Sequence, residues 1–408
     1  MHTNLESLKP WAMCSSHEAR DRELHMEISN FESTKETWNL LPSQRIADPM
    51  LSVKKYRRSA AGGGVNAKSN SSKSLNLRSI AELDSTVTHL LKNIFCHQKS
   101  HHEKMNAQSL SNTAAFVDDR IRAVQVDCVM GHSMVENVED FHNMLQFQSR
   151  IIRYNIVVGY LLSNPTINVS KFEHKFNAHA LQSSFSTFFE LFQISSLHTL
   201  LSKNERDENM DIENLPLHIL DEVMCYSCIL HLSSILFLNE EKASEFDIKR
   251  QCRRSSLFQG SSSSGLLSRA KLCLYFKKLT TTYEKELFPK WKWSLEVMNA
   301  ADIGNFIRCL HLITNTKEKE DDEKVCNNIF NGANTRWKCL ARCLLLPCLP
   351  LIRIGLLRQY NKSFGKAEKV SGNDVSVTTL TFCLLLCFFL FLLMKRQWNT
   401  IHKFLFFV

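Results

Sequence analysis

The fold of this chain is decided by one stretch, Phe116-Val117-Asp118-Asp119-Arg120-Ile121-Arg122-Ala123-Val124-Gln125-Val126-Asp127. Its apolar residues recur every three or four positions, which places them along one side of an α-helix. These residues are Phe116, Val117, Ile121, Val124 and, just beyond the stretch, Cys128. The stretch therefore predicts an amphipathic helix, which we expect to run from about Ala114 to Met130.

The charged residues of this helix are spaced for ion pairing. We expect Arg120 and Arg122 to pair with nearby acids, Asp118, Asp119 and Asp127 among them, because acids precede bases by three or four positions. On an exposed face such a pair contributes only about 0.2–0.5 kcal/mol. Removing one partner of a buried pair costs about 3–5 kcal/mol. The alternative is a solvated face with routine ion pairs.

Helical periodicity recurs along most of the remaining chain. Glycine (12) and proline (8) are scarce and phenylalanine (26) is abundant, which favours helices over a turn-rich β architecture. Ser79 followed by Glu82 is the pattern of an N-terminal capping box. We expect an all-α fold of stacked helical hairpins. The expected helices cover residues 80–94, 114–130, 135–162, 178–201, 215–238, 266–287 and 295–313.

Three motifs also occur in a fixed order. They are Met13-Cys14 with Glu18 and Asn30-Phe31-Glu32; Asp48-Pro49 with Val53-Lys54-Lys55-Tyr56-Arg57-Arg58-Ser59-Ala60-Ala61-Gly62; and Asp119-Arg120-Ile121-Arg122-Ala123-Val124 with Asp127. In this order and spacing they resemble the SAC/GANP family of mRNA-export scaffolds, over roughly residues 13–315. Ser15 and Gln125 stand where that family usually has Pro and Arg.

The resemblance implies a non-enzymatic scaffold of the nuclear mRNA-export machinery, located in the nucleus and at the nuclear pore. It implies a helical domain that ends in a PCI-like module with a winged helix. The implied partners are a PCI-domain protein and a small acidic subunit, with RNA as a further ligand. Gly304-Asn305-Phe306-Ile307-Arg308 resembles an element of the PCI-like portion. Asp119, Arg120, Arg122 and Asp127 are the family-motif residues of the deciding helix.

The chain divides by composition into consecutive segments. We expect residues 1–45 to be mostly disordered, with a short helix from Ser16 to Ile28. The other segments are a basic extended segment with a Gly/Ser linker (46–78), the helical domain (79–313, PCI-like from about 215), a remnant of the winged-helix approach (314–374) and an apolar tail (375–408).

A basic cluster precedes the linker. We expect Lys54, Lys55, Arg57 and Arg58 to contact nucleic acid or an import factor, and to play no part in folding. The alternative is a solvated basic loop. The net charge of +9 suits an acidic partner without choosing between nucleic acid and protein.

No catalytic motif or cofactor fingerprint occurs, and we expect neither enzymatic activity nor a cofactor. His97 and His101 lie four apart, yet no carboxylate motif accompanies them. Cys225 and Cys228 form a lone C-x-x-C within an apolar run. We expect the cysteines to act as small core residues.

Residues 375–394 carry no charge and approach the length of a membrane span. Three interpretations stay open: a membrane anchor, a buried helix, or a tail that replaces the winged helix of the family. The first supports an alternative function, a membrane-tethered helical adaptor without an RNA role.

The tail leads to a first prediction. Exposed to water, the thirteen residues from Phe382 to Met394 would each forgo roughly 1.5–3 kcal/mol of burial. The full chain should therefore be membrane-bound or prone to aggregate, and a chain ending at Asp374 should be soluble. The measurement compares soluble yield and carbonate-resistant membrane fraction for both. Equal solubility, with no membrane fraction, would favour the buried helix.

Overall fold

A computed structural model describes residues 10–56, 77–96, 107–131, 138–163, 174–203, 217–240, 288–314, 337–345 and 352. Within these ranges the chain is mostly helical and has no strand, which confirms the all-α prediction. One isolated antiparallel bridge joins Ser33 and Ala47. Several expectations lie outside these ranges: Arg57, Arg58, His97, His101, the Gly/Ser linker, the helix at 266–287 and the tail at 375–394.

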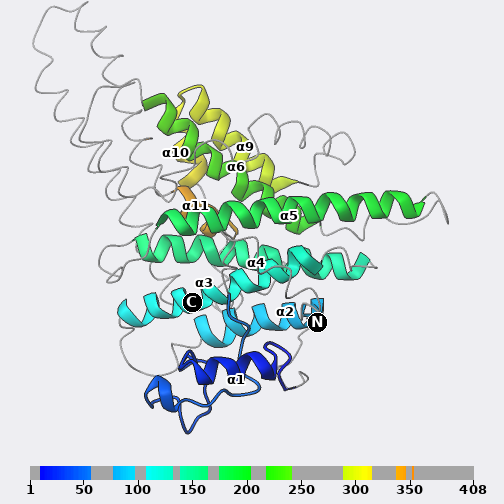
Figure 1. The fold of residues 1–408 in the computed structure, drawn as a ribbon. Helices are drawn as coiled ribbons and strands as arrows, with labels where there is room; N and C mark the ends of the chain where they lie inside the picture. The colour runs from blue at the N-terminus through cyan, green and yellow to red at the C-terminus, as the bar shows by residue number, and fades with distance from the viewer. Residues whose placement is uncertain are drawn as a thin grey trace, which may run out of the picture. The chain divides into compact units, whose positions relative to one another are not determined.

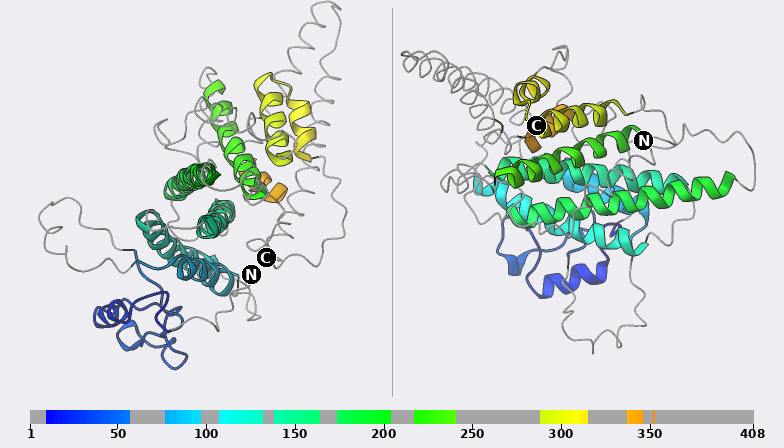
Figure 2. Two further views of the ribbon diagram at one scale, coloured as in Figure 1. Left: turned by 90° about the vertical axis from the view of Figure 1, so that its right-hand side faces the viewer. Right: turned by 90° about the horizontal axis from the view of Figure 1, so that it is seen from above.

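The chain forms two compact units, residues 1–172 with 180–216, and residues 173–179 with 217–408. The helices of the first unit run side by side in a stack, with α1 at its lower end (Figures 1 and 2). They are α1 (Ser16–Leu24), η2 (Pro42–Gln44), α2 (Ile80–Thr88), η4 (His89–Phe95), α3 (Ala107–Gly131), α4 (Val138–Ser163) and, from residue 180 on, α5 (His174–Lys203).

The predicted start of α2 is confirmed in detail. The Ser79 hydroxyl accepts a hydrogen bond from the Glu82 amide at 3.3 Å, and the Glu82 carboxylate accepts one from the Ser79 amide at 2.7 Å. This capping box satisfies two amides that the first helical turn leaves without partners. The helix continues without interruption into η4, a wider π-helical turn.

Apolar side chains from α2, η4, α3, α4 and α5 form the core of the first unit. The apolar side of α3 is buried as its periodicity predicts, with Val117 and Val124 fully covered. Tyr154 of α4 donates a hydrogen bond to the Ala114 carbonyl at 3.2 Å and packs edge-on against Phe95. Further core members are Leu83, Val87, Leu90, Leu91, Ile121, Phe147, Ile151, Phe188 and Phe192.

The N-terminal segment, defined here as residues 10–56, is folded. For residues 10–45, this corrects the expectation that the N-terminal region is mostly disordered. A small core of its own, in which Trp11 packs against Cys14, Ala19, Ile28 and Ala47, holds α1 to the following loops. Its polar composition misled the prediction, because many of its polar groups bind one another, as described below.

The second unit contains α6 (Leu217–Glu240), α9 (Pro289–Asp302), α10 (Phe306–Thr314) and α11 (Trp337–Leu345). Helix α6 packs against α9 and α11, and α9 packs against α10. Asp221 of α6 accepts hydrogen bonds from the Lys290 and Trp291 amides at 3.1 and 2.8 Å. This carboxylate therefore caps the N-terminus of α9 from a neighbouring helix.

The single helix expected over residues 295–313 is broken into α9 and α10. Gly304 adopts a φ of 72°, a left-handed conformation that glycine tolerates well. The Asn305 side chain then accepts a hydrogen bond from the Arg308 amide at 3.1 Å and starts α10. The prediction was wrong because one glycine inside a helical pattern lowers helix stability by only about 1 kcal/mol.

The structure also bears on the cysteines and on membrane insertion. The described cysteines are free thiols and all but Cys96 are buried, as expected for core residues. Burial raises the pKa of the Cys14 thiol to about 12. Within the ranges given above, no helix combines the length and the apolar character that a membrane span requires.

The buried imidazole of His89 predicts a pH dependence. Burial lowers its pKa from 6.5 to about 4, so the unfolded chain takes up a proton first as the pH falls. The neutral imidazole contributes fully above pH 6.5, and about 3 kcal/mol is lost as the pH falls toward 4. We expect urea unfolding of the His89→Leu variant to depend less on pH over this window than unfolding of the native chain.

Asp118 acts in the opposite direction in the same window, because burial raises its pKa to about 6. Both proteins contain Asp118, so the difference between their pH profiles isolates His89. Parallel profiles would show that the imidazole titrates alike in the folded and unfolded chain.

Candidate functional site

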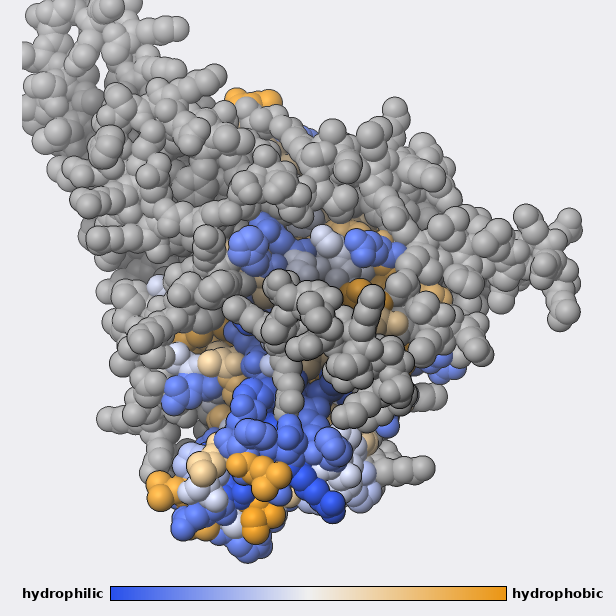
Figure 3. All heavy atoms as spheres, in the orientation of Figure 1, coloured by the Kyte–Doolittle hydropathy of each residue, from blue (hydrophilic) through white to orange (hydrophobic). Residues whose placement is uncertain are grey.

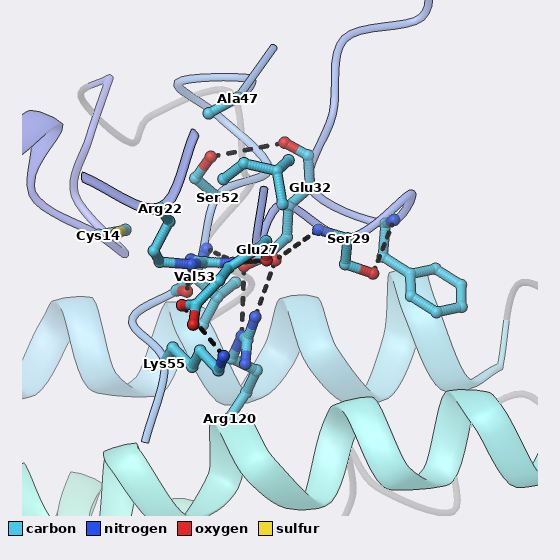
Figure 4. A network of polar contacts seen from close by, with 12 residues as sticks. Cys14, Arg22, Glu27, Ser29, Glu32, Ala47, Ser52, Val53, Lys55 and Arg120 are labelled. Carbon is cyan, nitrogen blue, oxygen red and sulfur yellow. Dashed lines mark hydrogen bonds and ion pairs between the residues drawn. The ribbon is translucent and has the colours of Figure 1, made fainter. Parts of the chain in front are cut away.

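The residues of the three sequence motifs meet at a buried carboxylate, that of Glu32 (Figure 4). Its Oε1 accepts hydrogen bonds from the Val53 amide at 3.1 Å and from Arg120 Nε at 3.2 Å. Its Oε2 accepts from Arg120 Nη2 at 2.8 Å and from Arg22 Nη2. Glu32 and Arg22 are fully buried, and Arg120 nearly so. We call Arg22, Glu32 and Arg120 the Glu32 cluster.

Arg22 reaches the cluster from α1. Its Nη1 also donates to the Val53 carbonyl at 3.0 Å, so one guanidinium binds both the Glu32 side chain and the backbone at Val53. The chain leaves α1 through Met26, whose φ of 57° is left-handed, and the Glu27 amide bonds back to the Arg22 carbonyl at 2.8 Å. This is the Schellman pattern of a helix C-terminus, which returns the chain toward Arg22.

Arg120 reaches the cluster from α3. Its guanidinium carbon lies 4.6 Å from the centroid of the Phe116 ring, one helical turn away. Phe31, beside Glu32, contacts the same ring at a centroid distance of 5.0 Å. Asp119 pairs with Arg120 and accepts a hydrogen bond from the Tyr56 amide at 3.3 Å. Helix α3 thus contacts the N-terminal segment at two places, Phe31-Glu32 and Tyr56.

The cluster is ionised. Burial opposes the charged form of Glu32, but the adjacent Arg120 and Arg22 outweigh it and lower the pKa of the carboxyl. Burial lowers the pKa of Arg22, and Glu32 more than restores it. Such a cluster is stable only as a whole, because each charge would be costly if buried alone.

A second acid of α3, Asp127, anchors another pair of cations. Its carboxylate accepts hydrogen bonds from Lys54 Nζ at 2.7 Å and Arg78 Nε at 2.8 Å, and it is almost fully buried. This corrects two expectations. Asp127 binds Lys54 and Arg78, where Arg120 or Arg122 was expected, and Lys54 joins the N-terminal segment to α3, whereas it was expected to play no part in folding.

The remaining predicted site residues have different surroundings. Lys55 Nζ pairs at 3.1 Å with Glu27, both partly exposed, and the Lys55 amide donates to the Glu18 carboxylate at 2.9 Å. Arg122 is half-buried, and its charge offsets part of the rise that burial causes in the pKa of Asp118. The structure therefore brings Asp119, Arg120, Asp127 and Lys54 together around one face of α3 and leaves Arg122 on its flank.

Three residues of the site were missed by sequence reasoning: Arg22, Glu32 and Arg78. Glu32 belongs to the first motif, so the presence of Asn30-Phe31-Glu32 in that motif was the available signal. Arg22 and Arg78 carry no local signal, because their partners lie elsewhere in the fold.

These charges can join and orient segments of the chain. The Glu32 carboxylate already accepts several hydrogen bonds in a water-excluded position, an arrangement that suits a structural role. Among the described residues, no group of three or more His, Cys, Asp or Glu side chains could hold a metal ion.

The cluster predicts a large and local effect on stability. Glu32→Gln removes the negative charge that Arg22 and Arg120 share, so we expect the free energy of unfolding to fall by about 3–5 kcal/mol. The matched control is Glu27→Gln, which breaks the partly exposed pair with Lys55 and should cost less than about 1 kcal/mol. Both are measured by urea denaturation at pH 7. A similar loss for the two variants would contradict the central role of Glu32.

Comparison with known proteins identifies a family for this chain. The model of the SAC3/GANP family matches residues 13–387, which covers most of the chain and includes every residue of the two ion clusters. The match continues beyond residue 315, where the motif resemblance ended, and into the apolar stretch at 375–394. No curated protein and no solved structure matches the chain. The chain belongs to the SAC3/GANP family.

Proposed function

We propose that this protein is a non-enzymatic scaffold of the nuclear mRNA-export machinery that binds a PCI-domain protein and a small acidic subunit. The observation that carries the proposal is the family match over residues 13–387, because family membership implies a scaffold role in mRNA export. The meeting of all three motifs at the Glu32 cluster supports it. A scaffold needs such rigid junctions to hold its binding surfaces in fixed positions.

The second unit offers an exposed apolar feature for the PCI partner. Ile303 and Ile307, on either side of the Gly304 turn, are 74% and 72% exposed. Side chains of this size contribute roughly 1.5–3 kcal/mol each when a partner buries them. Ile307 lies in the element that resembles the PCI-like portion of the family, and Ile303 directly precedes it, so we assign the partner contact to this turn.

An RNA contact is the second part of the proposal. Lys54 is bound to Asp127 inside the fold, so the contact is assigned to Lys55, which is partly exposed, and to Arg57 and Arg58, which follow it in the sequence. Cations on a surface bind phosphates with a strong dependence on salt. The same cluster would serve nuclear import, and the nuclear pore is the proposed site of action.

The membrane-tethered adaptor remains the competing function. It depends on residues 375–394, which the structure does not describe. The tail comparison predicted above separates the two, because a carbonate-resistant membrane fraction is expected only of a tethered protein.

The partner surface leads to a direct test. Replacing Ile303 and Ile307 by Asp should abolish co-purification of a PCI-domain protein with the tagged full chain from nuclear extract, since two charges would face an apolar contact. The control is Leu24→Asp, which changes an 80% exposed leucine of the N-terminal segment and should leave co-purification intact. Recovery of no PCI-domain protein with the native chain would count against the scaffold function itself.

A further inference from the structure

The N-terminal segment carries a group of large apolar side chains on its outer surface. Single exposed apolar residues are common in proteins, whereas a contiguous group of them marks a surface that another molecule covers. Six such side chains between residues 24 and 46 are 42% to 80% exposed. They are Leu24, Met26, Trp38, Leu40, Leu41 and Ile46. We call these six residues the apolar patch.

Hydrogen bonds hold the parts of the apolar patch next to one another. Two of its residues lie at the end of α1, and four lie in the loops around η2. The Glu23 carboxylate of α1 accepts a hydrogen bond from the Ala47 amide at 2.6 Å. Arg45 joins the same two parts, because its Nη1 donates to the Ile28 carbonyl at 3.2 Å and its Nε to the Leu40 carbonyl at 3.1 Å. Figure 3 shows apolar residues gathered at this end of the first unit.

The loops also hold Trp38 near Ile46. Thr34 is bonded to both residues, since its carbonyl accepts from the Trp38 amide at 3.0 Å and its amide donates to the Ile46 carbonyl at 3.0 Å. The backbone beneath the patch is therefore ordered before any partner arrives. A preorganised surface loses less conformational entropy on binding than a flexible one.

The apolar patch has the size of an interface core. Its six side chains together expose on the order of 600 Å², and each partner in a standard interface contributes about 800 Å². Polar residues at the rim would supply the rest of such an interface. Tryptophan, present here as Trp38, is also one of the residues that most often dominate binding energy.

The charges around the apolar patch balance one another. We count the charged side chains of residues 20–47 that are not buried, together with Lys55, which pairs with Glu27. They are four acids and four bases: Asp21, Glu23, Glu27, Glu36, Arg20, Lys35, Arg45 and Lys55. A neutral surface of this kind has no excess of cations to attract the phosphates of a nucleic acid.

A neutral apolar surface suits a second copy of the same chain. A two-fold dimer places identical surfaces against each other, so a patch with a large net charge would repel its own copy. Glu23 and Arg45 are hydrogen-bonded within their own chain, and they require no charged group from a partner. Interfaces between identical subunits are also more apolar than those of transient complexes.

We propose that the apolar patch is the interface of a homodimer, in which the patch of one copy packs against the same patch of the second copy. This interface does not depend on the export role. It is separate from the contact assigned to Ile303 and Ile307, so each can be removed without the other.

The first measurement is sedimentation velocity of the full chain in a mild non-ionic detergent, over a range of protein concentrations. We expect a dimer whose dissociation constant rises at least about tenfold in the double variant Leu41→Lys/Ile46→Lys, because four added charges would face one another across the interface. The control, Val126→Lys/Met130→Lys, adds the same charges to exposed residues of α3 and should dimerise as the native chain does. A monomeric native chain, or a double variant that dimerises equally well, would overturn the proposal.

Photo-crosslinking then locates the contact without adding charge. With p-benzoylphenylalanine in place of Leu41, which is 68% exposed, illumination should link two copies, with the linked residue of the second copy between residues 20 and 47. The same group in place of Val126 should give no link between copies. Links from position 41 to a different protein in nuclear extract, or to the lipid of phosphatidylcholine vesicles, in place of links between copies would refute the homodimer.

Discussion

The first unit depends on one buried carboxylate held between two guanidinium groups. Glu32 could not remain charged in its position without Arg22 and Arg120, and neither arginine could be buried without Glu32. One arginine comes from α1 and the other from α3. Because the Glu32 carboxylate needs both, α1 and α3 must be positioned so that both guanidinium groups reach it. Hydrophobic packing specifies position less strictly, because apolar contact has no direction.

Two groups of charged residues attach the N-terminal segment to α3. One is the Glu32 cluster, and the other is Asp127 with Lys54 and Arg78. The Glu32 cluster holds the middle of the segment. Asp127, two helical turns further along α3, holds the end of the segment, where Lys54 lies. Attachment at two points along one helix fixes the direction of the segment as well as its position. The outer surface of this segment still exposes several large apolar residues (Figure 3), among them Leu24, Met26, Leu41 and Ile46. A scaffold can thus present apolar groups on a segment that is rigidly seated.

The helices of this chain were predictable because their signals are local. The periodicity of α3 and the Ser79–Glu82 capping box depend on residues three or four positions apart, and both are as expected. The break at Gly304 was missed because the sequence does not distinguish a tolerated glycine from one at positive φ. The partners of Glu32 and Asp127 were missed for another reason. Arg120 lies 88 positions from Glu32, and no local pattern reports a contact at such a distance.

The same sequence separations determine when the protein can complete its fold. The N-terminal segment leaves the ribosome well before α3, and Lys54 is 73 residues ahead of Asp127. Arg22 and Glu32, only ten residues apart, can meet early, whereas Arg120 and Asp127 arrive later and must close long loops. Contacts of this range slow folding, since loop entropy is lost before the contact forms. The N-terminal segment therefore cannot complete its contacts until α3 has been synthesised.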